Sequence, residues 1–253
     1  MKKTNNLHLL WVLAKTDFKM RYNGSVLGYL WALLKPLLMF GVLYVFFAVL
    51  MRWDMPNYRL YLFLGIMIWN FFSEGTMAGL NALLSKGDII KKVYFPRILV
   101  VIASTLSAFM TLLLNIVIFL IFCLIEGFSL HWMMMFLPIY LMLLYALVLG
   151  LSMMFSVLQV RYRDISQIWE VLLQAGFFLT PIFYPLTTVS EKYLFYMFLN
   201  PMTGIMQYSR LLMLDRQFPS VQGIWYLLIG IFIIFSLGWI VFKKLSPNIA
   251  EKL

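Results

Sequence analysis

The stretch IWYLLIGIFIIFSLGWIVF, residues 224–242, carries no charged side chain and is followed at once by Lys243 and Lys244. A helix needs about 20 mostly apolar residues to cross about 30 Å of hydrocarbon, so this stretch predicts a membrane-spanning helix. The whole chain shares its character, because 63% of the 253 residues are hydrophobic and 12% are charged. Soluble domains are about half apolar and about a quarter charged. The composition therefore excludes a soluble globular protein, and the lack of charge excludes a disordered one.

Five further stretches have the length and apolar character of membrane spans. The fifth span is the least apolar, because Glu170 and Gln174 lie within it and Pro181 and Pro185 end it. We therefore expect an all-α polytopic membrane protein with six transmembrane helices and both termini on the same side of the membrane. In addition to Ile224–Phe242, the expected spans are Leu30–Met51, Leu60–Leu80, Ile98–Ile125, Met133–Leu158 and Ile168–Tyr184.

Basic residues predict the orientation. Lys plus Arg number 20 against 10 Asp plus Glu, an excess that would suggest nucleic acid in a soluble protein. In a membrane protein the same excess marks cytoplasmic segments, with anionic lipid head groups as a second role, so we expect no nucleic-acid partner. One side holds the fifteen residues Lys2, Lys3, Lys15, Lys19, Arg21, Lys35, Lys86, Lys91, Lys92, Arg97, Arg161, Arg163, Lys243, Lys244 and Lys252, and the other holds the five residues Arg52, Arg59, Lys192, Arg210 and Arg216. Both termini are therefore expected in the cytoplasm.

The segment before the first span predicts an amphipathic helix. Apolar residues recur there at helical spacing, with Lys15, Asp17 and Lys19 between them. Such a helix can lie in the membrane interface with its lysines toward anionic head groups, or it can pack on its own bundle, and the two readings are compatible. The apolar positions are Leu7, Leu10, Trp11, Ala14 and Phe18.

Two cytoplasmic segments carry charge. Residues 85–97 read SKGDIIKKVYFPR, a basic loop that keeps Ile89, Ile90, Val93 and Phe95 and so predicts docking onto a partner. The turn at 159–166 carries Arg161, Arg163 and Asp164, which by themselves are ordinary cytoplasmic charge.

The outer segment 185–223 contains two apolar stretches, Leu194–Leu199 and Met202–Leu214, that are too short or too polar to span. Prolines break or begin helices, and irregular backbone at membrane depth must be buried in protein or line a cavity. We therefore expect two re-entrant helices that dip into the outer leaflet and form a lid over an exit pathway. The prolines that punctuate the region are Pro181, Pro185, Pro201 and Pro219.

Several kinds of catalytic chemistry lack their sequence signatures. There is no Gly-x-x-x-x-Gly-Lys-Ser/Thr phosphate loop, and the two histidines, His8 and His131, are far apart in the predicted topology, so a metal or triad site is not expected. Glu74 and Glu170 are the acidic residues expected within the bilayer. Such carboxylates are either functional or paired with a nearby Lys or Arg.

Three groups of residues carry a resemblance to a family. The first is RYNGSVLGYLWALLKP at 21–36, and the second runs from Gly65 through Trp69 and Asn81 to Lys86 and FPR at 95–97. The third is RYRDI at 161–165, TPIFYP at 180–185, NPM at 200–202 and Arg210. In this order they resemble the membrane subunit of bacterial ABC exporters of lipid-linked polysaccharides, a type-2 ABC permease. The O-antigen branch fits best, although Lys35 stands where that branch is expected to have an apolar or neutral residue.

The resemblance implies one transmembrane domain over residues 1–253. Its parts are an interface helix (1–29), spans one to five (30–184), outer gate helices (185–223), and span six with a cytoplasmic tail (224–253). It also implies a homodimer in the bacterial inner membrane that binds two copies of a separate ATPase, so that ATP and Mg belong to the partner and this chain needs no cofactor. The implied ATPase-coupling residues are Ile89, Ile90, Lys91, Lys92, Phe95, Pro96, Arg97, Arg161, Arg163 and Asp164, and the implied outer gate residues are Pro185, Asn200, Pro201 and Arg210.

The implied substrate is a sugar chain on a polyprenyl diphosphate, with O-antigen favoured over teichoic acid or capsule. Cations at the inner membrane face would bind the diphosphate, and aromatic rings would stack on sugars, although each ring alone could equally face lipid. A drug-efflux ABC permease is the alternative within the superfamily, and a membrane-embedded glycosyl or lipid transferase is the alternative outside it. The head-group candidates are Lys15, Lys19, Arg21 and Lys35, with Arg97 as a fifth, and the channel candidates are Tyr44, Phe47, Trp69, Phe72, Phe177, Phe178, Phe183 and Tyr184.

Overall fold

The computed structural model describes residues 6–22, 24, 26–53, 55–92 and 95–249, and within them the regular structure is entirely helical. Four residues that were used in the charge and docking predictions lie outside the described residues: Lys2, Lys3, Val93 and Lys252. In chain order the elements are α1 (Asn6–Tyr22), η1 (Gly28–Leu30), α2 (Trp31–Tyr44), η2 (Val45–Leu50), α3 (Tyr58–Ser85), α4 (Gly87–Lys92), α5 (Ile98–Ile125), η3 (Trp132–Phe136), α6 (Leu137–Arg161), α7 (Ile165–Leu179), η4 (Leu186–Thr188), α8 (Glu191–Phe198), α9 (Pro201–Arg210), η5 (Leu211–Asp215), α10 (Val221–Leu245) and η6 (Ser246–Asn248).

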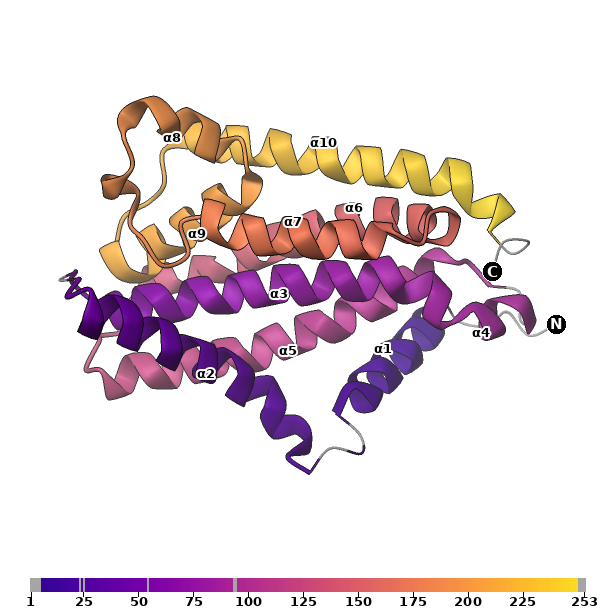
Figure 1. Ribbon diagram of the computed structural model, residues 1–253, viewed down its shortest axis with the longest axis horizontal. Helices are drawn as coiled ribbons and strands as arrows, with labels where there is room; N and C mark the ends of the chain where they lie inside the picture. Colours follow the sequence, from indigo (N-terminus) through magenta and orange to yellow (C-terminus); the bar gives the residue numbers. More distant parts are fainter. Residues whose placement is uncertain (1–5, 23, 25, 54, 93–94, 250–253) are drawn as a thin grey trace.

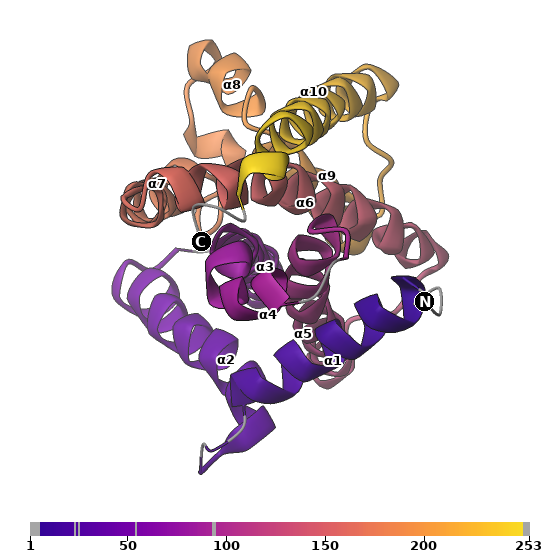
Figure 2. The same cartoon turned by 90° about the vertical axis from the view of Figure 1, so that its right-hand side faces the viewer.

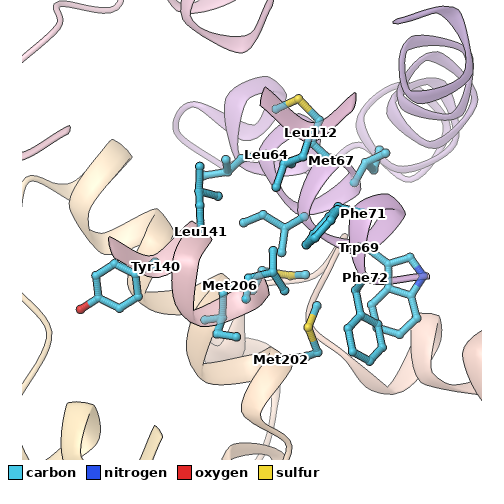
Figure 3. Close-up of a cluster of buried hydrophobic side chains, with 14 of the residues drawn as sticks. Leu64, Met67, Trp69, Phe71, Phe72, Leu112, Tyr140, Leu141, Met202 and Met206 are labelled. Atoms are coloured by element: carbon cyan, nitrogen blue, oxygen red, sulfur yellow. The ribbon is translucent and has the colours of Figure 1, made fainter. Parts of the chain in front are cut away.

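Helix α3 lies at the centre of the bundle. Figure 2 shows it surrounded by α2, α5, α6 and α7, and it contacts each of them. Its apolar residues are buried on almost every side, as expected for a helix that is hydrophobic all round. Figure 3 shows part of the resulting core, in which Leu64 and Met67 of α3 meet Leu112 of α5, Leu141 of α6 and Met206 of α9.

The positions of the predicted spans agree closely with the helices, but their number is not settled by length and composition. Among the described residues, four segments are long and apolar enough to cross a membrane: Gly28–Leu50, Ile98–Ile125, Trp132–Arg161 and Val221–Leu245. Helix α3 has 28 residues, or about 42 Å at 1.5 Å per residue, but its apolar run is interrupted by Asn70 and Glu74. Helix α7 is apolar but has only 15 residues. The count of six therefore remains a prediction.

Helix α7 ends earlier than the predicted fifth span. It stops at Leu179, and Thr180 is extended with φ −89° and ψ 139°. A residue before proline is pushed away from helical dihedrals by the proline ring, so Pro181 ends the helix five residues before the predicted boundary at Tyr184.

Helices α6 and α10 pack with their backbones almost touching. A Cβ atom placed on Gly238 of α10 would lie 2.0 Å from the carbonyl oxygen of Gly150 in α6. Small residues at such a crossing let two membrane helices approach closely enough for extensive van der Waals contact. The pair holds the last long helix against the bundle.

The two ends of the bundle differ in character. At one end, α8 and α9 lie beside the start of α10, and at the opposite end α4, the α6–α7 turn and the end of α10 lie together (Figure 1). The second end has its own small core, to which Ile90 of α4, Val160 of α6 and Phe242 of α10 contribute. The predicted cytoplasmic segments therefore share one end of the molecule.

The outer segment forms two short helices, as predicted. Helix α9 is buried against α3, α6 and α10. Helix α8 has a largely exposed surface that includes Tyr193, Phe195 and Tyr196. Whether this pair re-enters the membrane remains a prediction.

Candidate functional site

Three charged side chains meet where α1, α2 and α3 approach one another. Nζ of Lys35 in α2 lies 2.5 Å from Oε1 of Glu74 in α3, and Nη1 of Arg21 in α1 lies 3.5 Å from Oε2 of the same carboxylate. Arg21 also donates to the hydroxyl of Ser107 in α5 at 3.4 Å. Two of the predicted head-group cations therefore share one counter-ion, and for Glu74 pairing with nearby cations is confirmed. Glu170 on α7 is exposed and makes no ion pair within the described part of the chain.

A cavity of about 470 Å³ opens beside these charges, a size that falls within the range of small-molecule pockets. One face comes from α3 and the opposite face from α5, and Arg21 and α2 close one side. The polar residues of its lining are Arg21, Lys35, Asn70, Glu74, Thr111 and Asn115. We call this cavity with its charged side chains the α2–α3–α5 pocket.

The other head-group candidates lie elsewhere. Lys15 and Lys19 are exposed on α1 and form no ion pair among the residues that the structure describes. Arg97 donates to the backbone carbonyl of Ser246. The structure thus places only two of the five candidates at the pocket.

Helix α1 packs on its own bundle. Ala14 is completely buried, and Asp17 pairs with Lys86 at the end of α3 and accepts a hydrogen bond from Ser104 of α5 at 3.0 Å. Trp11 remains 54% exposed, and Leu7 is also exposed. Packing of this helix on its own bundle is therefore confirmed, and placement of its exposed face in the membrane interface remains a prediction.

The first predicted coupling segment forms the short helix α4. Ile90 is buried in the core at this end of the bundle, whereas Ile89 is 45% exposed and Lys91 and Lys92 are exposed. Phe95 is partly buried against the same core, and Pro96 is exposed. The segment thus has an anchored side and an outward apolar and basic side.

The second predicted coupling segment is a tight turn between α6 and α7. Arg161, Arg163 and Asp164 are all exposed. Gln159, which is buried, holds the turn from inside: its side-chain amide donates to the Arg163 carbonyl at 3.1 Å and its oxygen accepts from the Ser166 amide at 2.9 Å. The prediction missed Gln159, although a glutamine in the last turn of an otherwise apolar helix was the available signal.

Seven of the eight predicted channel aromatics form one connected set of ring contacts. Phe183 is its centre, stacked on Phe47 at 4.7 Å between ring centroids, and in contact with Phe177, Phe178 and Tyr184. Trp69 and Phe72 join through Phe177. Tyr44 is linked to this set indirectly, because it contacts Tyr58, which contacts Trp53, which stacks on Phe47. We call the seven the aromatic cluster.

Only part of the aromatic cluster presents a free surface. Phe178 is 67% exposed, whereas Trp69 and Phe72 are each 6% exposed and belong to the core (Figure 3). In this conformation the two buried rings stabilise α3 against α7, and the exposed Phe178 is the ring of the cluster that is most open to a ligand.

Arg210, predicted at the outer gate, is the largest fully buried side chain. Its guanidinium donates to the carbonyls of Pro181, Ile182 and Tyr61, and its Cζ lies 3.4 Å from the centroid of the Tyr61 ring. The α7–α8 connection is thereby tied to both α9 and α3. Burial lowers the pKa of Arg210 to about 10, and the neighbouring Tyr61 and Tyr58 oppose this lowering. The side chain is therefore charged at neutral pH.

The remaining outer gate candidates support the same junction. Asn200 caps α9 by accepting from the Met202 amide at 3.1 Å, and its amide donates to the Thr180 hydroxyl at 3.3 Å. Pro201 occupies the first position of α9, where a missing N–H costs nothing. Pro185 lies at the start of η4, partly buried.

Two tyrosines and a glycine at this junction were missed from the sequence. Tyr58 and Tyr61 donate to the carbonyls of Phe183 and Tyr184 at 3.0 and 2.9 Å. Gly65 leaves the space that Arg210 fills, because a Cβ there would lie 2.3 Å from Nη2. The motif beginning at Gly65 was the available signal.

The sequence profile of the ABC-2 type transporter family matches residues 8–214, most of the described helices. The chain belongs to this family. It is therefore a multi-pass membrane protein of a class that works with an ABC ATPase.

The relatives below match between 77% and 96% of this chain. The chain is 30% identical over 249 residues to the O-antigen export system permease protein RfbA of Klebsiella pneumoniae, covering 96% of this chain and 94% of that protein. It is 28% identical over 216 residues to RfbA of Myxococcus xanthus, covering 85% and 83%. It is 23% identical over 200 residues to the polysialic acid transport protein KpsM of Escherichia coli, covering 77% and 76%.

Proposed function

We propose that this chain is the membrane permease subunit of an ATP-driven exporter of polyprenyl-diphosphate-linked polysaccharide, with O-antigen as the favoured cargo. The observation that carries the proposal is the similarity to O-antigen export permeases over almost the whole length of both proteins. The similarity to a polysialic acid transport protein supports the broader class of polysaccharide cargo.

The proposed assembly is a homodimer in the bacterial inner membrane that binds two copies of an ATPase. Both termini, α4 and the α6–α7 turn would face the cytoplasm, in keeping with the excess of basic residues in these segments. ATP and Mg would be held by the ATPase, since the sequence carries no phosphate-binding loop of its own.

The proposed coupling surface is the end of the bundle that carries α4 and the α6–α7 turn. Exposed Ile89, Lys91 and Lys92 would contact the ATPase, together with Arg161, Arg163 and Asp164. The anchors on the protein side are Ile90 in the shared core and Gln159 beneath the turn, which together would transmit displacement into α3, α6 and α10.

The proposed cargo pathway begins at Arg21 and Lys35 and continues past the exposed side of the aromatic cluster to the outer gate. Aromatic faces bind the C–H surfaces of sugars without requiring one pattern of hydroxyls, which suits a repeating polymer. Arg210, Asn200, Pro201 and Pro185 would set the position of the gate helices over the exit.

Deletion of the gene tests the proposal. Deletion cells should accumulate lipid-linked glycan on the cytoplasmic side and lose surface polysaccharide, and the intact gene should restore export. Normal surface polysaccharide together with increased sensitivity to small toxic compounds would instead identify a drug-efflux permease. Glycan that is never assembled would identify a transferase.

Coupling can be tested in the complemented strain. Asp164→Ala, or replacement of the Phe95–Arg97 turn, should abolish export while the protein stays in the membrane. Lys192→Ala, at an exposed outer position, is the matched control and should export normally. Full export by the Asp164 and Phe95–Arg97 variants would contradict the coupling assignment.

A further inference from the structure

The charges of the α2–α3–α5 pocket do not balance. Arg21 and Lys35 contribute two positive charges, and Glu74 contributes the one negative charge that contacts them. The other nearby ion pair, Asp17 with Lys86, is balanced in itself. The Lys35 side chain is 62% exposed and that of Arg21 is 25% exposed, so the excess positive charge faces outward, where it can pair with an anionic head group. The pocket therefore has the electrostatic character of an anion site that is only half neutralised.

Two amide side chains in the same pocket each have one atom without a hydrogen-bond partner among the described residues. Oδ1 of Asn115, a residue that is 6% exposed, accepts no hydrogen bond, although its Nδ2 donates to the Thr111 carbonyl at 3.0 Å. Nδ2 of Asn70 likewise has no acceptor. A buried polar atom without a partner is energetically costly. Because both residues line the cavity, a ligand that both donates and accepts hydrogen bonds would satisfy them.

The polar positions follow the helix repeat on both walls. Asn70 and Glu74 are four residues apart on α3, and Thr111 and Asn115 are four residues apart on α5. Residues at this spacing lie on one face of a helix, so each wall presents a polar stripe. Along α3 the stripe leads from the carboxylate that holds the cations to the amide of Asn70. Met67 and Phe71 supply the apolar part of that wall.

We propose that the α2–α3–α5 pocket binds the phosphate head group of a membrane amphiphile, with Glu74 as an internal counter-ion that holds Arg21 and Lys35 in place until the phosphate arrives. This proposal deepens the proposed function. It rests on that function only in naming polyprenyl diphosphate as one of the two molecules that can supply the phosphate group. The other source is a phospholipid.

Glu74 and the phosphate compete for the same two cations. Arg21 and Lys35 can each bind a carboxylate or a phosphate oxygen through charge-assisted hydrogen bonds. With Glu74 in contact, a phosphate meets a net charge of plus one, and without that carboxylate it would meet plus two. Glu74 thus weakens head-group binding, which favours release of a cargo that must move on. Asn70 and Asn115 would bind the neighbouring hydroxyl or oxygen atoms of the head group.

The test uses the assembled permease–ATPase complex in phosphatidylcholine nanodiscs and measures binding of radiolabelled undecaprenyl diphosphate. Lys35→Gln should weaken binding by about tenfold or more, because one of two cations is lost. Glu74→Gln, which keeps the shape and removes the charge, should tighten binding several-fold. Lys244→Gln removes an exposed cation at the end of α10 and is the control, with binding expected to be unchanged.

Asn115→Leu provides a measurement that does not depend on the ion pairs. It keeps every charge and a similar shape but removes the amide, so binding should weaken several-fold while thermal unfolding of the complex stays unchanged or shifts upward. The proposal is overturned if Asn115→Leu leaves binding unchanged, or if Glu74→Gln binds the diphosphate no more tightly than the wild type does. If Glu74→Gln does not fold, the Asn115→Leu result alone decides.

Competition with phosphatidylglycerol separates the two sources. Displacement of the diphosphate at comparable concentration assigns the pocket to phospholipid head groups, and failure to displace it assigns the pocket to the diphosphate. Export measured in cells with the same variants separates this proposal from the proposed function. Polysaccharide export by a complex that binds no phosphate here would end the proposal and leave the function intact. Phosphate binding in a complex that exports no polysaccharide would end the proposed function and leave the proposal for this pocket intact.

Discussion

Nη2 of Arg210 donates to the backbone carbonyl of Tyr61 at 3.1 Å, and the guanidinium covers the ring of the same tyrosine. One side chain at the end of α9 thus donates to a carbonyl in α3 and to two carbonyls after α7. The proposed outer gate is therefore positioned by a hydrogen-bond junction as well as by apolar packing.

Arg210→Lys should destabilise the protein by roughly 2 kcal/mol or more, because a single ammonium cannot reproduce the planar donors that reach three carbonyls. The measurement is the Tm of the purified protein in detergent. Arg216→Lys, at an exposed arginine in the same outer segment, should leave the Tm nearly unchanged. Equal Tm values for the two variants would contradict the role of Arg210.

Gly65→Ala should destabilise the same junction from the opposite side. The added methyl would lie 2.3 Å from Nη2 of Arg210 and 2.9 Å from the Ile182 carbonyl, so the guanidinium would have to move. Overpacking of this kind costs roughly 1–3 kcal/mol. The matched control is Gly41→Ala in α2, where a Cβ meets no atom within 4 Å. Its Tm should stay equal or rise, because alanine favours a helix, and a similar fall in both would argue against the crowding at Gly65.

Gly238→Ala should loosen α10 from α6, because the methyl would collide with the Gly150 backbone rather than with a movable side chain. We expect a lower Tm and faster proteolysis of the segment that joins α9 to α10. Gly230→Ala on the same helix meets only a Pro201 side-chain atom at 3.6 Å and should behave as the wild type. A wild-type Tm in Gly238→Ala would show that the two helices can separate without loss.

Gln159→Leu should uncouple ATP hydrolysis from export. The turn at Arg161–Asp164 would lose the hydrogen bonds that fix its backbone, about 1 kcal/mol each, while the apolar core around α6 stays intact. Substrate-stimulated ATPase activity of the assembled complex should fall, and the Tm should drop by only a few degrees, as expected for the loss of two hydrogen bonds. Gln167→Leu, an exposed glutamine eight residues further on, is the control. Undiminished stimulation in Gln159→Leu would remove this residue from the coupling argument.

The positions of the long helices could be predicted well because most of them are apolar runs closed by charge or proline. The predicted span Ile98–Ile125 coincides with α5 residue for residue. The end of α7 was misplaced because the apolar content of residues 180–184 counts toward a helix, whereas Pro181 imposes extended backbone on Thr180. Composition alone does not register that restriction.

The residues of the pocket were only half predictable. Charge at the membrane face pointed to Arg21 and Lys35, but that Glu74 joins them follows from how α1 and α2 pack on α3. Asn70 and Asn115 were missed because a single amide in an apolar helix carries no distance information. Their shared cavity arises from the packing of α3 on α5, which a sequence pattern does not specify.

Arg97 binds the carbonyl of Ser246, and Ile249 is buried against the core that also holds Ile90. The chain thus continues to make structural contacts after α10 has ended. A purification tag or fluorescent protein inserted between Ser246 and Ile249 would break these contacts, close to the surface proposed for the ATPase. Tags for reconstitution should therefore be placed at another site, or be separated from Ile249 by a long flexible spacer.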